Sequence, residues 1–179
     1  MSKKDIKMGK QVGQWRDTVR HKDGTVEVGD WHYNQIQVDS QRLIMAFLKE
    51  SAVGVPATFG GLQYLALGEG AASWDLSAPT QDTEDQTLTS ELARIQIDAA
   101  DMFYLDDVGA VSLTPTRRLK VSAVIPFSIS GDLREFALFG GDATSTVDTG
   151  FMFNWIVHPR IEKTNTQEIL REVIFTGAV

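Results

Sequence analysis

The sequence contains no cysteine, and this absence excludes disulfide bonds, thiolate metal sites and a cysteine nucleophile. Only three histidines are present, His21, His32 and His158, and they are too far apart along the chain to share a metal-ligand spacing. His158 precedes Pro159 at the end of an aromatic segment, where we expect a hydrogen-bonded structural residue in preference to a general base. The expected setting is a reducing cytoplasm.

Long hydrophobic runs are also absent, since no segment approaches the roughly 20 apolar residues of a membrane-spanning helix. The basic start, MSKKDIKMGK, is not followed by an apolar segment, so we expect no secretory signal. A chain of 179 residues, 42% of them apolar, is long enough for one well-buried domain. We therefore expect a flexible N-terminal arm over residues 1–14 and a single domain over residues 15–179.

Positive charge is scarce in the middle of a chain whose net charge is −7. Residues 69–107 contain ten acidic residues and one basic residue, giving −9, whereas residues 1–30 contain seven basic and five acidic residues, giving +2. A nucleic-acid surface needs clustered positive charge, so we expect no nucleic-acid partner. The acidic segment is either a solvated face or a contact for the basic arm of a neighbouring copy.

Short apolar or alternating segments separated by turn residues are what the sequence does contain. Lys22-Asp23-Gly24 precedes the β-branched run 25–28, a pattern typical of a β-hairpin. Residues 62–68 are apolar nearly throughout, which predicts an inner strand buried on both faces. Further strands are expected at residues 95–97, where a short helix from Thr89 is the alternative, and at 102–105, 111–113, 119–127, 133–139, 150–157 and 170–176.

One helix is expected at about residues 40–51, because Leu43, Ile44, Phe47 and Leu48 occupy one helical face. Together these elements predict a mainly β fold. We expect an antiparallel β-sandwich or barrel-like domain with one or two short helices.

The stretch 133–163 pairs the two most aromatic strands around a polar loop that Gly140-Gly141 opens. A second long polar loop, residues 69–87, contains Trp74. Loops of this length are either functional or contacts in an assembly. Trp74 is therefore expected either as a satellite core residue or as an anchor in a partner's pocket.

No pattern in the sequence supports a catalytic or cofactor site. Residues 68–73 begin like a dinucleotide fingerprint but lead to Pro79 in place of a helix. The acidic groups at 82–85 and 106–107 are either calcium ligands or solvated turns, and their spacing favours solvated turns. We expect no enzyme activity, no cofactor and no metal.

Several segments, read in order, carry a resemblance to a known family. They are YLALGEG (64–70), WD (74–75), Leu88 with ELAR (91–94), LREFALFGG (133–141), GFMFN (150–154), His158, KT (163–164) and LRE (170–172). This order resembles structural proteins of the tail and neck modules of tailed bacteriophages and prophages. It is similar to the N-terminal attachment part of tail-collar fibre proteins, where a glycine-rich turn precedes a Leu-x-x-Glu-Leu-x-Arg segment and a late Glu-Phe/Ile-Gly-Leu-Phe strand.

The resemblance, which spans about residues 60–175, implies a non-enzymatic virion protein assembled in the cytoplasm of the host bacterium. The sequence shows no repetitive shaft and no receptor-binding tip, which favours a collar, connector, tail or baseplate component. The implied partners are further copies of the chain, as a trimer or a hexamer or dodecamer ring, and other phage tail or neck proteins. No membrane contact is expected.

The expected interface residues are Lys3, Lys4 and Lys7 in the arm, Trp74 in the long loop, and Arg134 and Glu135 near the glycine pair. For Arg134 and Glu135 the alternative is a local ion pair across strands.

The alternative function is a carbohydrate-binding β-sandwich in which exposed Trp31, Trp74 or Trp155 stacks on sugars. A hydrolase has the least support, because no catalytic pair can be chosen among 24 acidic residues.

Overall fold

The computed structural model describes residues 12–36, 40, 60–82 and 84–176 of the chain. The described part forms eleven strands and two short 3-10 helices. Their bounds are β1 Val12–His21, β2 Val26–Val28, β3 His32–Ile36, β4 Gly60–Gly68, η1 Ala72–Asp75, β5 Glu91–Gln96, η2 Ala99–Asp101, β6 Met102–Leu105, β7 Val111–Ser112, β8 Arg118–Ile125, β9 Gly131–Gly141, β10 Phe151–Lys163 and β11 Gln167–Thr176.

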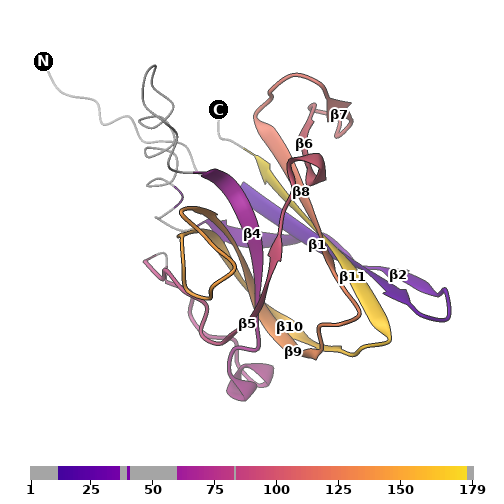
Figure 1. The fold of residues 1–179 in the computed structure, drawn as a ribbon, viewed down its shortest axis with the longest axis vertical. Coiled ribbons are helices and arrows are strands. Elements are labelled where there is room, and N and C mark those ends of the chain that lie inside the picture. The colour runs from indigo at the N-terminus through magenta and orange to yellow at the C-terminus, as the bar shows by residue number, and fades with distance from the viewer. Residues whose placement is uncertain (1–11, 37–39, 41–59, 83, 177–179) are drawn as a thin grey trace, which may run out of the picture.

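All of these strands belong to one antiparallel sheet in the order β5-β4-β9-β10-β3-β1-β11-β8-β6-β7, with β2 paired to β1 beside this path. Strand β3 joins the two halves of the sheet, because it pairs with β1 on one side and with β10 on the other. The sheet curls at this junction into a half-barrel, so that β1, β11 and β8 cross over β4, β9 and β10 (Figure 1). The prediction of a mainly β, antiparallel, sandwich- or barrel-like fold with one or two short helices is confirmed, and the described residues contain almost no helix beyond η1 and η2.

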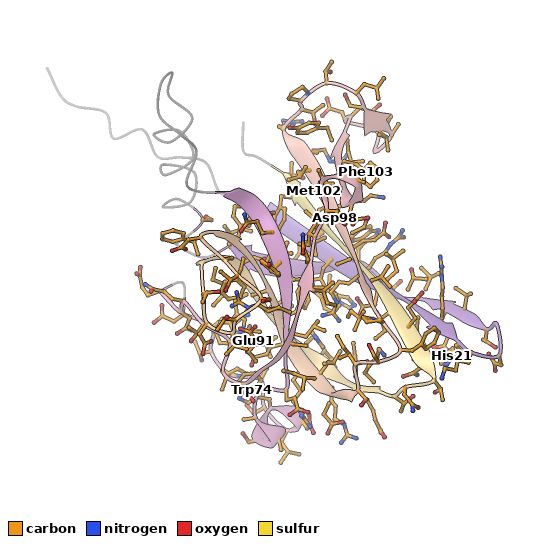
Figure 2. All side chains as sticks on the ribbon, viewed as in Figure 1. His21, Trp74, Glu91, Asp98, Met102 and Phe103 are labelled. Atoms are coloured by element: carbon orange, nitrogen blue, oxygen red, sulfur yellow. The ribbon has the colours of Figure 1, made fainter. Side chains whose placement is uncertain are left out.

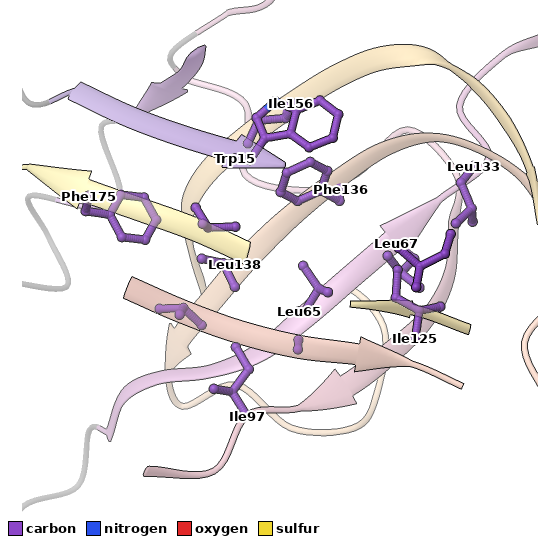
Figure 3. Close-up of a cluster of buried hydrophobic side chains, with 14 residues drawn as sticks. Trp15, Leu65, Leu67, Ile97, Ile125, Leu133, Phe136, Leu138, Ile156 and Phe175 are labelled. Atoms are coloured by element: carbon purple, nitrogen blue, oxygen red, sulfur yellow. The ribbon is translucent and has the colours of Figure 1, made fainter. Parts of the chain in front are cut away.

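Side chains fill the space inside the curl, as Figure 2 shows for the whole molecule and Figure 3 for the core. Trp15 packs edge-to-face against Phe136, with ring centroids 5.2 Å apart. The other buried members of this inner cluster are Leu65, Leu67, Ile97, Val121, Ala123, Ile125, Leu133, Leu138, Ile156, Ile169, Val173 and Phe175. They come from both halves of the sheet, which explains why strands distant in sequence fold over one another.

A second apolar cluster lies on the opposite face of β4, β9 and β10. Its buried members are Ala66, Leu88, Ala137, Phe139, Ala143, Met152 and Trp155. Leu65 and Leu67 of β4 face the inner cluster while Ala66 faces this outer one. The strand predicted at 62–68 is therefore buried on both faces over Leu65–Gly68, as its continuous apolar sequence indicated.

The strands predicted from the sequence are found close to their expected bounds, including the β1–β2 hairpin around Gly24, where φ is +90°. Residues 91–96 form a strand, so the helical alternative after Thr89 is wrong. Strand β1 begins at Val12, three residues inside the range expected for the arm. The rest of that arm, and the helix expected at about 40–51 apart from its first residue, lie outside the described residues.

The strand predicted at 150–157 runs on to Lys163. The pairing with β9 shifts between Val157 and Ile161, so the intervening residues lie outside the regular ladder. Pro159 is among them, and it has no N–H to donate to a neighbouring strand. A bulge accommodates such a residue and lets the strand continue beyond it.

Lys163, at the end of β10, is buried among backbone carbonyl groups. Its Nζ donates to the carbonyl oxygens of Pro126 at 2.9 Å and Ile129 at 2.8 Å, in the β8–β9 connection. It also donates to those of Thr164 at 3.1 Å, in the β10–β11 turn, and Gln167 at 2.6 Å, at the start of β11. Burial lowers the pKa of this ammonium. One side chain thus joins two connections that lie next to each other.

We expect Lys163→Met to lower the free energy of unfolding by about 1–3 kcal/mol, because it removes charge-assisted hydrogen bonds and leaves buried carbonyls unpaired. Methionine keeps the apolar stem, so the loss reports the ammonium group. Arg160→Met is the matched control, since that side chain is 42% exposed. Urea unfolding of both variants checks this, and equal stabilities would contradict the structural role of Lys163.

Candidate functional site

Acidic and histidine side chains do not gather into a reactive cluster in the described ranges. Within them, no group of three or more His, Asp or Glu residues is placed to hold a metal ion. The carboxylates of Asp82 and Asp106 accept backbone N–H groups of their own turns, from Glu84 and from Val108 and Ala110. That geometry is the one expected of capped acidic turns. The described residues contain no helix with the length and apolar character needed to cross a membrane.

His158 is held inside the curl, between Trp15 and Phe136. Its Nδ1 lies 2.8 Å from the carbonyl oxygen of Pro159 and therefore carries the proton, because a carbonyl only accepts. Burial, together with the positive charge of Arg171, lowers the pKa of His158 to about 3. The imidazole is thus neutral at pH 7. This environment is that of a buried structural histidine.

The charged neighbour of His158 is a buried ion pair. Arg171 is 1% exposed and donates from Nε and Nη2 to the two carboxylate oxygens of Asp17, at 2.7 and 2.6 Å. Its guanidinium carbon lies 4.1 Å from the ring centroid of Phe136 and 5.2 Å from that of Trp15. The pair therefore ties β1 to β11 at the centre of the core.

Arg134 and Glu135, two residues expected at an interface, are both buried. Arg134 donates from Nε and Nη2 to the carboxylate of Asp75, at 2.7 and 2.9 Å, and from Nη1 to the carbonyl of Glu69. The Arg134 guanidinium lowers the pKa of Asp75. The Asp75 carboxylate belongs to η1 in the long loop, so this ion pair fixes the loop to β9.

Glu135 fixes the end of the same loop. Its carboxylate accepts the backbone N–H groups of Thr89 and Ser90, at 3.2 and 2.9 Å, and the indole N–H of Trp155, at 2.8 Å. A Cβ on Gly68 of β4 would lie 2.5 Å from the Glu135 Cγ. Only a glycine at position 68 therefore leaves room for the Glu135 side chain between the paired strands β4 and β9. The alternative, an ion pair between Arg134 and Glu135, is not formed, because successive residues of a strand point to opposite faces of the sheet. Arg134 pairs with Asp75 instead, and Glu135 accepts from the three N–H groups named above.

Trp74 is half-buried at the outer apolar cluster. Its ring lies 6.4 Å from that of Trp155 in an edge-to-face arrangement. The structure thus gathers Trp74, Arg134 and Glu135 around one loop, which they pack onto the sheet. Contacts within one chain therefore explain where these three side chains lie. Their role in an interface with another chain stays a prediction. Lys3, Lys4 and Lys7 lie outside the described residues.

The loop between β9 and β10 is also fastened to the sheet. The side chain of Arg94 is buried and pairs with Glu91. It also donates to the carbonyl oxygens of Thr144 and Thr149, at 3.2 and 2.7 Å. Its guanidinium carbon lies 4.3 Å from the Phe139 ring centroid. Arg94 therefore holds the loop at 140–149 against the sheet through Thr144 and Thr149. A role of its outer surface in assembly stays a prediction.

Eight exposed large apolar side chains lie on two segments, and of these the sequence singled out only Trp31. On the β6–β7 hairpin they are Tyr104, Val108, Val111 and Leu113, which we call the hairpin surface. On the β1–β2–β3 segment they are Val26, Val28, Trp31 and Tyr33. Figure 1 shows the β6–β7 hairpin and the tip of the β1–β2 hairpin at the periphery, and Figure 2 places Met102 and Phe103 at the base of the first. The sequence assigned residues 111–113 to an ordinary strand, because strand order decides which strand lies at the edge.

A hollow of about 380 Å³ adjoins Trp74, and Asp75, Pro159 and Arg160 contribute to its lining. Of the other tryptophans expected to stack on sugars, Trp155 is 4% exposed. Trp31 is 38% exposed, and the Arg16 guanidinium carbon lies 4.6 Å from its ring centroid. Trp74 is thus the tryptophan that combines a hollow with neighbouring polar groups.

Comparison of the chain with protein-family models, curated proteins and solved structures finds no match.

Proposed function

We propose that this chain is a non-enzymatic structural subunit of a tailed bacteriophage virion, which self-associates as a collar, connector, tail or baseplate component. The observation that supports self-association is the placement of apolar side chains. Val108, in the β6–β7 turn, is 89% exposed, and Leu113, directly after β7, is 100% exposed. Clustered exposed apolar residues mark sites of interaction with other proteins.

The internal use of charge supports a structural role. Arg94, Arg134, Lys163 and Arg171 each fasten one segment to another by donating to the protein's own carboxylates or carbonyls. Such fastening makes a rigid body, which suits a subunit that docks without rearrangement. The assignment to a phage tail or neck rests on the sequence resemblance over about residues 60–175.

Negative-stain electron microscopy of the purified full chain tests this proposal. We expect closed, symmetric particles, as a trimer or a hexamer or dodecamer ring. A field without such particles, with no binding to tail or neck components of the same phage in a pull-down, would contradict it.

A carbohydrate-binding module is the second candidate, and the hollow beside Trp74 is the observation that favours it. An indole face with Asp75 and Arg160 nearby offers both stacking and hydrogen bonds to a sugar. A glycan array separates the two candidates. Binding that is lost in Trp74→Ala and kept in Trp31→Ala supports the carbohydrate role, whereas an array without hits excludes it.

A further inference from the structure

The turn of the β1–β2 hairpin contains an Asp-Gly step. Gly24 follows Asp23 there, and the sequence contains no other Asp-Gly and no Asn-Gly. Both residues are exposed, in the turn between the end of β1 and the start of β2. Before a glycine, a side-chain carboxyl group approaches the next main-chain nitrogen with little obstruction, because glycine has no side chain.

The carboxylate of Asp23 is folded back over its own turn. Its Oδ1 accepts the backbone N–H of Thr25 at 2.9 Å. This hydrogen bond closes an Asx-turn, which keeps the carboxyl group beside the peptide bond between Asp23 and Gly24. A Cβ on Gly24, where φ is +90°, would meet no heavy atom within 4 Å. The carboxyl group therefore lies close to an amide nitrogen that no neighbouring side chain shields.

We propose that Asp23 is a site of spontaneous covalent modification, at which the aspartyl residue isomerises to isoaspartate through a cyclic succinimide. The nitrogen of Gly24 attacks Cγ of the protonated Asp23 carboxyl group and forms a new N–Cγ bond. The nitrogen loses its proton, the bond between Cγ and the hydroxyl group breaks, and one water molecule leaves.

Hydrolysis of the succinimide completes the isomerisation. Water that adds at Cγ restores aspartate. Water that adds at the main-chain carbonyl carbon of Asp23 breaks the bond from this carbon to the Gly24 nitrogen, so that the main chain then runs through Cγ. The water released in the first step is replaced in the second, and the product has the mass of the starting protein. Neither an oxidant nor a reductant is needed.

One hydrogen bond of the turn must open before the nitrogen can attack. The N–H of Gly24 donates to the carbonyl oxygen of His21 at 3.0 Å. This bond lies at the exposed end of a hairpin, where backbone hydrogen bonds open most readily. Strand β2 has three residues and pairs only with β1 in the described part of the chain. The reaction therefore needs only local opening, and the core stays packed.

Peptide mapping of the full, folded chain after prolonged incubation at mildly acidic pH tests the site. Electron-transfer fragmentation identifies isoaspartate by position, and methyl transfer from S-adenosylmethionine by an L-isoaspartyl methyltransferase measures its amount. We expect isoaspartate to accumulate at position 23. Asp107 is the control within the same protein, because its side chain is 81% exposed but precedes Val108, whose branched side chain hinders attack. We expect position 107 to remain aspartate.

Asp23→Glu is the matched variant, since its side chain keeps the charge but would have to close a larger ring. We expect this change to reduce methyl transfer to background. No isoaspartate at position 23 of the wild type, equal amounts at positions 23 and 107, or undiminished methyl transfer in Asp23→Glu would each overturn the inference. The inference does not depend on the proposed function, because none of these results depends on whether the chain self-associates.

Discussion

Asp17→Ala is expected to lower the free energy of unfolding by about 3–5 kcal/mol, because it leaves the buried guanidinium of Arg171 without its counter-charge. The two side chains make a bidentate pair between β1 and β11, with Arg171 fully enclosed. An unpaired guanidinium at this position keeps the full free-energy cost of its desolvation. This cost is larger than the free energy by which the intact ion pair would stabilise the fold relative to a pair of apolar side chains. Urea unfolding at pH 7 measures the difference.

Two controls identify the cause. Asp107→Ala removes an acid from an exposed pair and should change stability by no more than about 1 kcal/mol. Asp17→Leu combined with Arg171→Met removes both charges and should recover much of the loss, since well-packed apolar residues often replace buried pairs at little cost. If Asp17→Ala behaves like Asp107→Ala, Arg171 is not the buried charge described above.

Acid is expected to destabilise the protein through His158. Because burial and Arg171 lower its pKa from 6.5 to about 3, the folded state holds the imidazole neutral while the unfolded state binds a proton below pH 6.5. The unfolded state therefore binds more protons as pH falls from 6.5 towards 3, and stability decreases over this window. At about 1.4 kcal/mol per pH unit, the loss assigned to His158 reaches about 3–4 kcal/mol at pH 4.

His158→Gln isolates this contribution, since glutamine does not titrate. Carboxylates whose pKa is lowered by basic partners, such as Asp75 and Glu172, also lose stability in acid, but they are common to both proteins. We expect the variant to lose less stability than the wild type between pH 7 and pH 4. Identical pH profiles for the wild type and His158→Gln would show that the imidazole is accessible to protons.

The sequence predicted the strands well because the patterns that indicate a strand involve residues that are close together along the chain. The turn at Asp23-Gly24 set the first hairpin, and the continuous apolar run at 62–68 indicated a strand covered on both faces. The end of β10 was predicted six residues too early, because a proline usually ends a strand and Pro159 follows the predicted segment. The bulge that accommodates Pro159 depends on the register with β9, which the sequence does not show.

The roles of the charged residues were not predictable in the same way. Arg134 finds Asp75 across 59 residues of sequence, and Arg171 finds Asp17 across 154. A sequence shows that such residues are charged but not which strands become neighbours. The sequence therefore could not show that both long loops are held against the sheet, and the charged residues near them were assigned to an interface with a partner. The exposed apolar hairpin was missed for the same reason, since only strand order reveals that β7 lies at the edge.

Self-association is the central claim, and the absolute mass of the wild-type chain in solution tests it most directly. Multi-angle light scattering from about 1 to about 100 µM covers the range in which a specific assembly with micromolar or tighter affinity forms. We predict a discrete mass that is a whole-number multiple of 19.8 kDa, at least two, at the upper concentrations. A mass of 19.8 kDa over the whole range would contradict the account.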